Sequence, residues 1–206
     1  MKGFTTIKDT VQETVIRKSR FIAYAYALKS EEDAEEKIAF LRKKHYDATH
    51  VCYAYISDEE GRRGRYSDDG EPSGTAGQPM FDALKKSGIT KCLVAVVRYF
   101  GGILLGAGGL VRAYSSSVSE VLQLAEKVTF EVKDFYSVEF PFSLYKKVQT
   151  GLSRLGIVTK IEYGMAVFIQ IATEVGFNFE EELNNLCATK MEILYEGEGF
   201  YTGGKQ

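Results

Sequence analysis

The sequence predicts an α+β protein with two domains, residues 1–132 and 133–206. Its 206 residues, 45% of them hydrophobic, are enough to bury the core of one large or two small domains. The chain has 26 basic and 28 acidic side chains. Residues up to Val132 contain 19 basic and 18 acidic side chains, and the rest contains 7 basic and 10 acidic ones, so the second part is the more acidic. Candidate strands and helices are mixed within both parts, as expected for the α+β class.

The first domain is expected to begin with two strands and a helix. Side chains that favour strands cluster in residues 12–17 and 21–28, on either side of a basic corner. This corner, Arg17, Lys18, Ser19 and Arg20, is expected to be a solvated turn. Ser30, followed by Asp33, is typical of a helix start. The apolar stripe of this supporting helix is Ala34, Ile38 and Leu41.

A strand at 51–57 follows, with both faces expected to be at least half buried. His50, at its mouth, is either a hydrogen-bonded structural residue or a ligand. The segment 58–67 has no apolar periodicity and predicts a mobile surface loop. Its arginines either form a solvated turn or reach phosphate groups through their guanidinium forks.

The stretch 67–112 is where the sequence places a functional site. An acidic, glycine-rich loop precedes a short helix, expected to start at Pro79 and to end before Gly88. The strand 92–97 is wholly apolar, as in a central strand covered on both faces, and Arg98 follows it. A second glycine-rich turn leads into a helix with core positions Leu110, Tyr114, Val118, Val121 and Ala125.

This second turn invites comparison with phosphate-binding loops, but it matches none of them. Gly101 and Gly106 have the separation of a P-loop, whereas Ala107 and Gly108 stand where Lys and Ser/Thr are required. No G-x-G-x-x-G pattern is completed either. ATP hydrolysis of the P-loop type is therefore not supported.

Arg112 is expected in about the first turn of the following helix. A cation there opposes the helix dipole by about 0.3 to 1 kcal/mol. Either an anion binds nearby, or the arginine pairs with an acidic residue of the first loop, Asp68, Asp69 or Glu71.

The second domain has six predicted elements. They are a strand at 135–142, a helix at 143–155, strands at 157–163 and 166–172, a helix at 179–187 and a strand at 190–195. Their β-α-β-β-α-β order is that of a ferredoxin-like domain.

Composition excludes several classes of protein. The first residues lack the apolar run of a signal peptide, and no segment approaches the length of a membrane span, so we expect a cytoplasmic protein without membrane contact. The formal net charge of −2 excludes a generally basic nucleic-acid binder, which limits any polyanion contact to a local patch. Cys52, Cys92 and Cys187 have no paired spacing and are interpreted as buried thiols.

Three segments together resemble the signature of the YigZ/Impact family, in its bacterial YigZ type. They are DATH at 47–50, SDDGEPSGTAGQP at 67–79, and RYFGG at 98–102 with LGAGGLVRAY at 105–114. Residues 134–198 resemble the C-terminal domain of the bacterial members by pattern. The resemblance covers most of the first domain.

The resemblance implies a fold for each domain and a general role. The N-terminal domain is expected to have the left-handed βαβ fold shared by a small-subunit ribosomal protein and domain IV of elongation factor G. The C-terminal domain is expected to be ferredoxin-like, similar to the last domain of that factor. In eukaryotic relatives the Impact domain competes for an activator of the kinase that senses uncharged tRNA, so the resemblance implies regulation of translation.

Three functions remain open at this stage. The preferred one is a non-enzymatic regulator linked to translation, which binds RNA or a ribosome-associated protein through the glycine-rich, arginine-bearing cleft. The second is a nucleotide- or phosphate-binding enzyme, in which the acidic loop and His50 hold Mg²⁺ or move a proton. The third is a protein-interaction module without nucleic acid, whose exposed apolar patch is Tyr99, Phe100, Ile103 and Leu104.

The candidate residues follow from these hypotheses. No residue is a defensible nucleophile, so we assign no catalytic residue, no metal ligand and no cofactor, and the sequence indicates no oligomeric state. Arg62, Arg63 and Arg65 form a peripheral basic loop. The candidates for binding a ligand, RNA or a partner are His50, Asp68, Asp69, Glu71, Thr75, Gly77, Arg98, Tyr99, Phe100, Gly101, Gly102, Gly106, Gly108 and Arg112.

Overall fold

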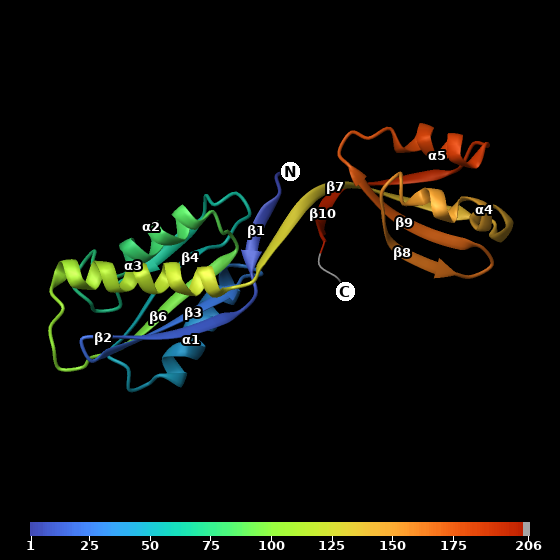
Figure 1. Ribbon diagram of the computed structural model, residues 1–206. Coiled ribbons are helices and arrows are strands. Elements are labelled where there is room, and N and C mark those ends of the chain that lie inside the picture. The colour runs from blue at the N-terminus through green and yellow to red at the C-terminus, as the bar shows by residue number, and fades with distance from the viewer. Residues whose placement is uncertain (204–206) are drawn as a thin grey trace. The chain divides into compact units, whose positions relative to one another are not determined.

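The computed structural model describes residues 1–203, in which ten strands and five helices form two compact units (Figure 1). One unit is Phe4–Thr129. The other joins Met1–Gly3 with the described residues from Phe130 onward. Each unit combines one sheet with its own helices, which confirms the α+β class.

The first unit is built on an antiparallel sheet in the order β2-β3-β6-β4-β5. Its central strand β6 (Cys92–Tyr99) is buried from Cys92 to Arg98, which confirms a strand covered on both faces. Both β3 (Ser19–Ala27) and β4 (His50–Ile56) pair with it along its length. Because β6 holds the centre, the residues at its end have fixed positions relative to both neighbours.

The hairpin of β2 (Thr10–Ile16) and β3 turns through Arg17 and Lys18. Their φ angles are +46° and +67°, as in a type I′ turn, which favours Asn-Gly because both positions are left-handed. Residues other than glycine cost about 1 to 2 kcal/mol each in that conformation. The predicted basic corner is therefore a strained turn.

The helix α1 (Glu31–Lys44) covers one face of this sheet (Figure 1). The Ser30 hydroxyl accepts a hydrogen bond from the Asp33 amide at 3.3 Å, so the predicted N-cap is confirmed. Ala34, Ile38 and Leu41 are its buried residues, as the apolar stripe predicted.

The other face is covered by α2 (Gly77–Ser87) and α3 (Ala107–Leu124) (Figure 1). The start predicted for α2 at Pro79 is wrong by two residues, because the Asp68 carboxylate caps the amides of Ala76 and Gly77 from outside the helix. Its end is as predicted, since Gly88 adopts the left-handed C-cap conformation with φ +71°.

The loop predicted at 58–67 is also partly wrong, because β5 (Gly64–Ser67) pairs with β4. Three of the four β5 residues are exposed. An edge strand with exposed side chains carries no apolar alternation, so the sequence pattern does not reveal it.

The second unit contains β7 (Lys127–Phe140), α4 (Phe142–Leu152), β8 (Ile157–Tyr163), β9 (Val167–Glu174), α5 (Phe179–Cys187) and β10 (Ile193–Thr202). Its strands are antiparallel in the order β10-β7-β9-β8, and both helices contribute to one core with β7 and β9. This is the predicted ferredoxin-like arrangement. A strand that was not predicted, β1 (Phe4–Ile7), pairs with β7. It lies within the bounds of the first unit, as do the first three residues of β7. Within residues 1–203, no helix is long and apolar enough to cross a membrane.

Replacing Ser30 with alanine tests the cap of α1. We expect Ser30→Ala to lower the free energy of unfolding by about 1 kcal/mol, because the Asp33 amide loses its acceptor. Chemical denaturation of the full chain measures the loss. Ser119→Ala is the control, since that exposed hydroxyl lies inside α3 and caps nothing. Equal effects of the two substitutions would contradict the assignment of the cap.

Candidate functional site

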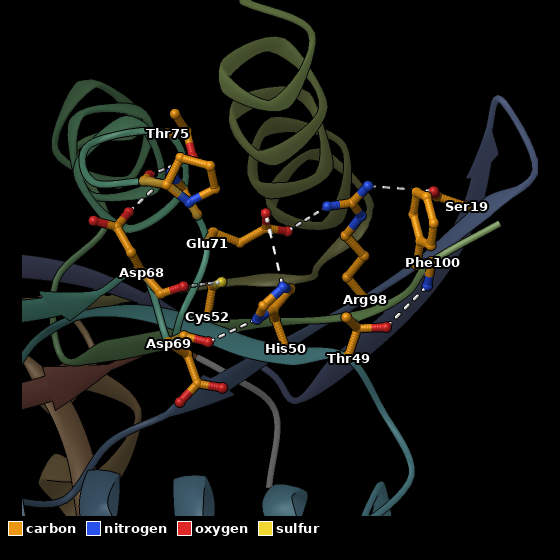
Figure 2. A network of polar contacts seen from close by, with 12 residues as sticks. Ser19, Thr49, His50, Cys52, Asp68, Asp69, Glu71, Thr75, Arg98 and Phe100 are labelled. Atoms are coloured by element: carbon orange, nitrogen blue, oxygen red, sulfur yellow. Dashed lines mark hydrogen bonds and ion pairs between the residues drawn. The ribbon is translucent and has the colours of Figure 1, made fainter. Parts of the chain in front are cut away.

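A buried ion pair joins the acidic loop to the end of β6 (Figure 2). The Arg98 Nη1 donates to Glu71 Oε1 at 2.6 Å, and the two side chains are only 6% and 2% exposed. The Tyr114 hydroxyl, from α3, donates to the same oxygen at 2.7 Å. A loop, a strand and a helix that are distant in sequence therefore meet at one carboxylate.

The Arg98 guanidinium is also enclosed by aromatic rings. Its Cζ lies 5.5 Å from the ring centre of Phe21 and 5.6 Å from that of Phe100. Its Nη2 lies 3.5 Å from the Ser19 hydroxyl, and its buried Nε has no hydrogen-bond partner within residues 1–203. Arg98 is thus committed to the interior and is not free to bind a phosphate.

Asp68 holds the acidic loop against the start of α2 (Figure 2). Its carboxylate accepts hydrogen bonds from the amides of Gly74, Ala76 and Gly77 at 2.8, 3.0 and 2.8 Å. Burial raises the pKa of Asp68, whereas the hydrogen bonds from these three amides lower it. The three bonds together have the larger effect, so the pKa lies below its usual value. Gly77 is required here, because a Cβ would lie 2.7 Å from the carbonyl carbon of Ser67.

Asp69 connects the loop to β4 and α1. Its carboxylate accepts from the Val51 amide at 2.7 Å and from Arg42 Nη2 at 2.6 Å. Its carbonyl oxygen lies 2.8 Å from His50 Nδ1, which must carry the proton because a carbonyl only accepts. His50 Nε2 then faces Glu71 Oε2 at 3.9 Å (Figure 2). These contacts favour the structural interpretation of His50.

The Cys52 thiol and the Tyr114 hydroxyl, which lie near Glu71, stay protonated at neutral pH. Burial, together with the nearby carboxylates, raises the pKa of the Cys52 thiol to about 12. Its Sγ donates to the Asp68 carbonyl oxygen at 3.0 Å. Burial also raises the pKa of Tyr114, and Cys52 and Glu71 add to the effect. Neither group supplies an anionic nucleophile at neutral pH.

The glycine-rich turn after β6 packs directly against the β2–β3 turn. A Cβ on Gly101 would lie 2.0 Å from the Lys18 carbonyl carbon, so only glycine fits. The Gly101 amide donates to the Ser19 hydroxyl at 3.2 Å. Gly102 and Gly106 adopt φ angles of +82° and +70°, which favour glycine.

A cavity of about 360 Å³ lies between the two glycine-rich loops. Its polar wall includes Thr49, His50, Glu71 and Arg98, and Phe100 and Leu104 also line it. We call the exposed residues Phe100, Ile103 and Leu104 the apolar rim; they are 45%, 40% and 81% exposed. The Phe100 amide donates to the Thr49 hydroxyl at 3.0 Å, which holds the start of the rim in place.

Tyr99 and Arg112 are among the candidates that do not line this cavity. Tyr99 lies on the opposite face of β6, where its hydroxyl contacts His45 Nδ1 at 2.9 Å and Asp47 at 3.2 Å, because neighbouring strand residues alternate in direction. Arg112 was expected in the first turn of its helix, but α3 starts at Ala107 and places it in the second. It is exposed and makes no ion pair within residues 1–203, so the alternative in which it pairs with the acidic loop is wrong, and the alternative of a nearby anion stays open.

The other candidates have structural contacts or lie elsewhere. The Thr75 hydroxyl donates to the Pro72 carbonyl oxygen at 2.6 Å and caps no helix. Gly108 lies beside the Arg112 guanidinium, since a Cβ there would be 3.7 Å from Nη1.

The peripheral arginines lie in and before β5 and do not line the cavity. Arg65 pairs with Glu31 at 3.0 Å and Arg62 with Glu60 at 2.7 Å, while the Arg63 amide donates to Asp58. Two of the three arginines are therefore already paired with carboxylates, which favours the solvated turn over the phosphate contact.

Sequence reasoning missed the roles of Ser19 and Tyr114. Ser19 was placed in a solvated corner, whereas it is fully buried. Tyr114 was assigned to the core only, and no local pattern indicates that its hydroxyl reaches Glu71, 43 residues away. Thr49 had a usable signal, because it lies inside the DATH segment.

Comparison with known proteins places this site in a recognised sequence family. The pattern of the Impact N-terminal domain matches residues 17–122. The chain is 48% identical to IMPACT family member YvyE of Bacillus subtilis over 98% of its own length and 94% of that protein. It is 44% identical to IMPACT family member YigZ of Escherichia coli over 52% of this chain and 54% of that protein. A crystal structure described as a hypothetical protein has a TM-score of 0.63 at 29% identity, covering 94% of this chain and 97% of the other.

The cap formed by Asp68 makes stability depend on pH. Because folding lowers the pKa of Asp68, its contribution is present above the unfolded pKa of about 3.9 and is lost as the pH falls through the folded pKa. We expect Asp68→Asn to cost about 1 to 2 kcal/mol at neutral pH, since the charge and one acceptor are lost. This cost should shrink as the pH is lowered.

Urea denaturation as a function of pH measures the cost of Asp68→Asn. The control is Asp82→Asn, on the exposed face of α2. A cost that does not change with pH would contradict this account.

Breaking the buried ion pair on one side should be worse than removing both partners. We expect Glu71→Gln to lower the free energy of unfolding by about 3 to 5 kcal/mol, because the charge of Arg98 stays buried without its partner. The double variant Glu71→Leu with Arg98→Met buries no charge and should be less destabilised than Glu71→Gln. Denaturant titration of the three proteins decides this, and a double variant that is the least stable of all refutes it.

Proposed function

Because the chain belongs to the family of the Impact N-terminal domain, we propose that it is a non-enzymatic regulator linked to translation, which acts by binding a ribosome-associated protein. The apolar rim carries this proposal. The translational role is the one that membership implies, and the rim supports a protein as the partner. Such a role would place the protein in the cytoplasm.

The rim has the properties of a protein-binding surface. Leu104 is 81% exposed and Phe100 is 45% exposed, and both line the same cavity. Ile103, next to Leu104 in the sequence, is 40% exposed. Exposed apolar side chains that form a contiguous patch mark interaction sites, whereas single scattered ones are normal on any protein surface. Gly102 and Gly106, with φ angles of +82° and +70°, lie on either side of Ile103 and Leu104 in the sequence.

The charges in the cavity argue against RNA at this position. The guanidinium of Arg98 is neutralised by Glu71 at 2.6 Å and is enclosed by two rings. A phosphate would have to compete with a buried carboxylate for the arginine, and a buried charge that loses its partner costs several kcal/mol. The cavity therefore favours an apolar side chain over a phosphate.

The contacts of the acidic loop also disfavour an enzyme that uses Mg²⁺. Asp68 accepts from three amides, Asp69 from Val51 and Arg42, and Glu71 from Arg98 and Tyr114. A metal ion would have to displace these donors. We therefore interpret the acidic loop as a scaffold that holds the rim and the end of β6 together.

Replacing Leu104 tests the rim. We expect Leu104→Ser to weaken binding to ribosome-associated protein by about tenfold, which corresponds to about 1.4 kcal/mol of lost apolar burial. The measurement is cosedimentation of the tagged full chain with the ribosomal fraction, before and after nuclease treatment. Leu124→Ser is the matched control, because Leu124 is 63% exposed on the same unit but lies at the far end of α3.

Two outcomes contradict the proposal. If Leu104→Ser and Leu124→Ser bind as the unaltered chain does, the rim is not the contact. If nuclease treatment abolishes the part of the binding that Leu104→Ser weakens, the partner at the rim is RNA.

A further inference from the structure

Arg17 and Arg112 are exposed arginines that line one groove, although they are 95 positions apart in the sequence. The groove runs beside α3, with a volume of about 620 Å³, and its floor includes Ser115, Ser116 and Ser119. Leu105 lines both this groove and the cavity described above, so the two are neighbours. The arginines come from the β2–β3 turn and from the second turn of α3.

The groove carries positive charge that the protein itself does not neutralise. In the part of the chain that the structure describes, neither arginine makes an ion pair, and neither does the neighbouring Lys18. Glu120, the one acidic residue of α3, instead accepts from the side chains of Gln12 and Thr14 on β2. Of the other arginines of the same unit, Arg63 also lacks an ion pair within residues 1–203, and five pair with carboxylates, namely Arg20, Arg42, Arg62, Arg65 and Arg98.

The β2–β3 turn presents its basic side chains at a cost to stability. Arg17 and Lys18 occupy both left-handed positions of a turn in which Asn-Gly would be unstrained. The turn is held by the buried Ser19 hydroxyl and by the close approach of Gly101. Strain that the surrounding structure maintains is a reason to look for function in the strained residues.

From these observations we propose that the groove binds the phosphate backbone of single-stranded RNA. Guanidinium groups match phosphate oxygens with paired hydrogen bonds, and the groove offers two of them. Among residues 1–203, no aromatic side chain lines it, so bases are not stacked and binding is independent of sequence. The proposal extends beyond the protein contact at the rim and rests on different residues.

The serines explain why the strand is RNA. Ser115, Ser116 and Ser119 donate to the carbonyl oxygens of Val111, Ala113 and Ser115 at 2.7, 3.1 and 2.9 Å. Their hydroxyl oxygens therefore remain as acceptors in the groove. A ribose 2′-hydroxyl can donate to them and a deoxyribose cannot.

The test is a titration of the full chain with a fluorescent, unstructured oligoribonucleotide over a series of salt concentrations. Each phosphate contact on a single strand contributes about 0.7 to the slope of log K against log salt. We expect Arg112→Gln to reduce the slope by about that amount and to weaken binding at low salt. Arg63→Gln, an exposed arginine outside the groove, is the matched control and should change neither. DNA of the same sequence should bind more weakly than RNA.

A second variant separates binding from folding. Replacing the turn with Arg17→Asn and Lys18→Gly should raise the melting temperature, because the strain is relieved, and should lower the affinity for RNA. A purely structural turn would show the first effect without the second. The proposal is overturned if the unaltered chain does not bind RNA at low salt, if Arg112→Gln binds like Arg63→Gln, or if DNA binds as tightly as RNA. Leu104→Ser should retain RNA binding, so this test and that of the rim can fail independently.

Discussion

The ion pair of Glu71 and Arg98 is the constraint on which the first unit depends. Two charges that are almost completely removed from water have to meet at short distance, or the fold loses several kcal/mol. Glu71 can reach Arg98 only if the acidic loop crosses the end of β6, and Tyr114 fixes α3 against the same oxygen. The contact therefore ties the acidic loop to the start of the second glycine-rich loop at the end of β6.

Much of the family signature is therefore architectural. Asp68 caps α2, Gly77 and Gly101 allow two backbone segments to touch, and His50 is held by the Asp69 carbonyl oxygen. What this framework leaves exposed is an apolar rim on one side of Leu105 and a basic groove on the other. The proposed contacts with protein and RNA use those surfaces, so the buried signature presents the binding residues without itself binding.

Prediction from the sequence worked where a local pattern reports burial directly. The apolar run of β6, the stripe and cap of α1 and the β-α-β-β-α-β order of the second unit were all predicted, because periodicity and capping depend on nearby residues. It missed β1 and β5, which are short and lie at sheet edges. An edge strand is stabilised by pairing with a strand that is distant in sequence, so the side chains of the edge strand itself show little apolar pattern.

By itself, the sequence determined the family, the central strand and the two stretches that carry the site. It did not distinguish Arg98 from Arg112. Arg98 follows an apolar segment and Arg112 a glycine-rich one, and both look equally suited to binding an anion. Only the tertiary structure decided that Arg98 is buried against Glu71 and that Arg112 shares an exposed groove with Arg17. The physical reason is that the role of a charge depends on its burial and its neighbours, and here those neighbours, Glu71 for Arg98 and Arg17 for Arg112, lie 27 and 95 residues away along the chain.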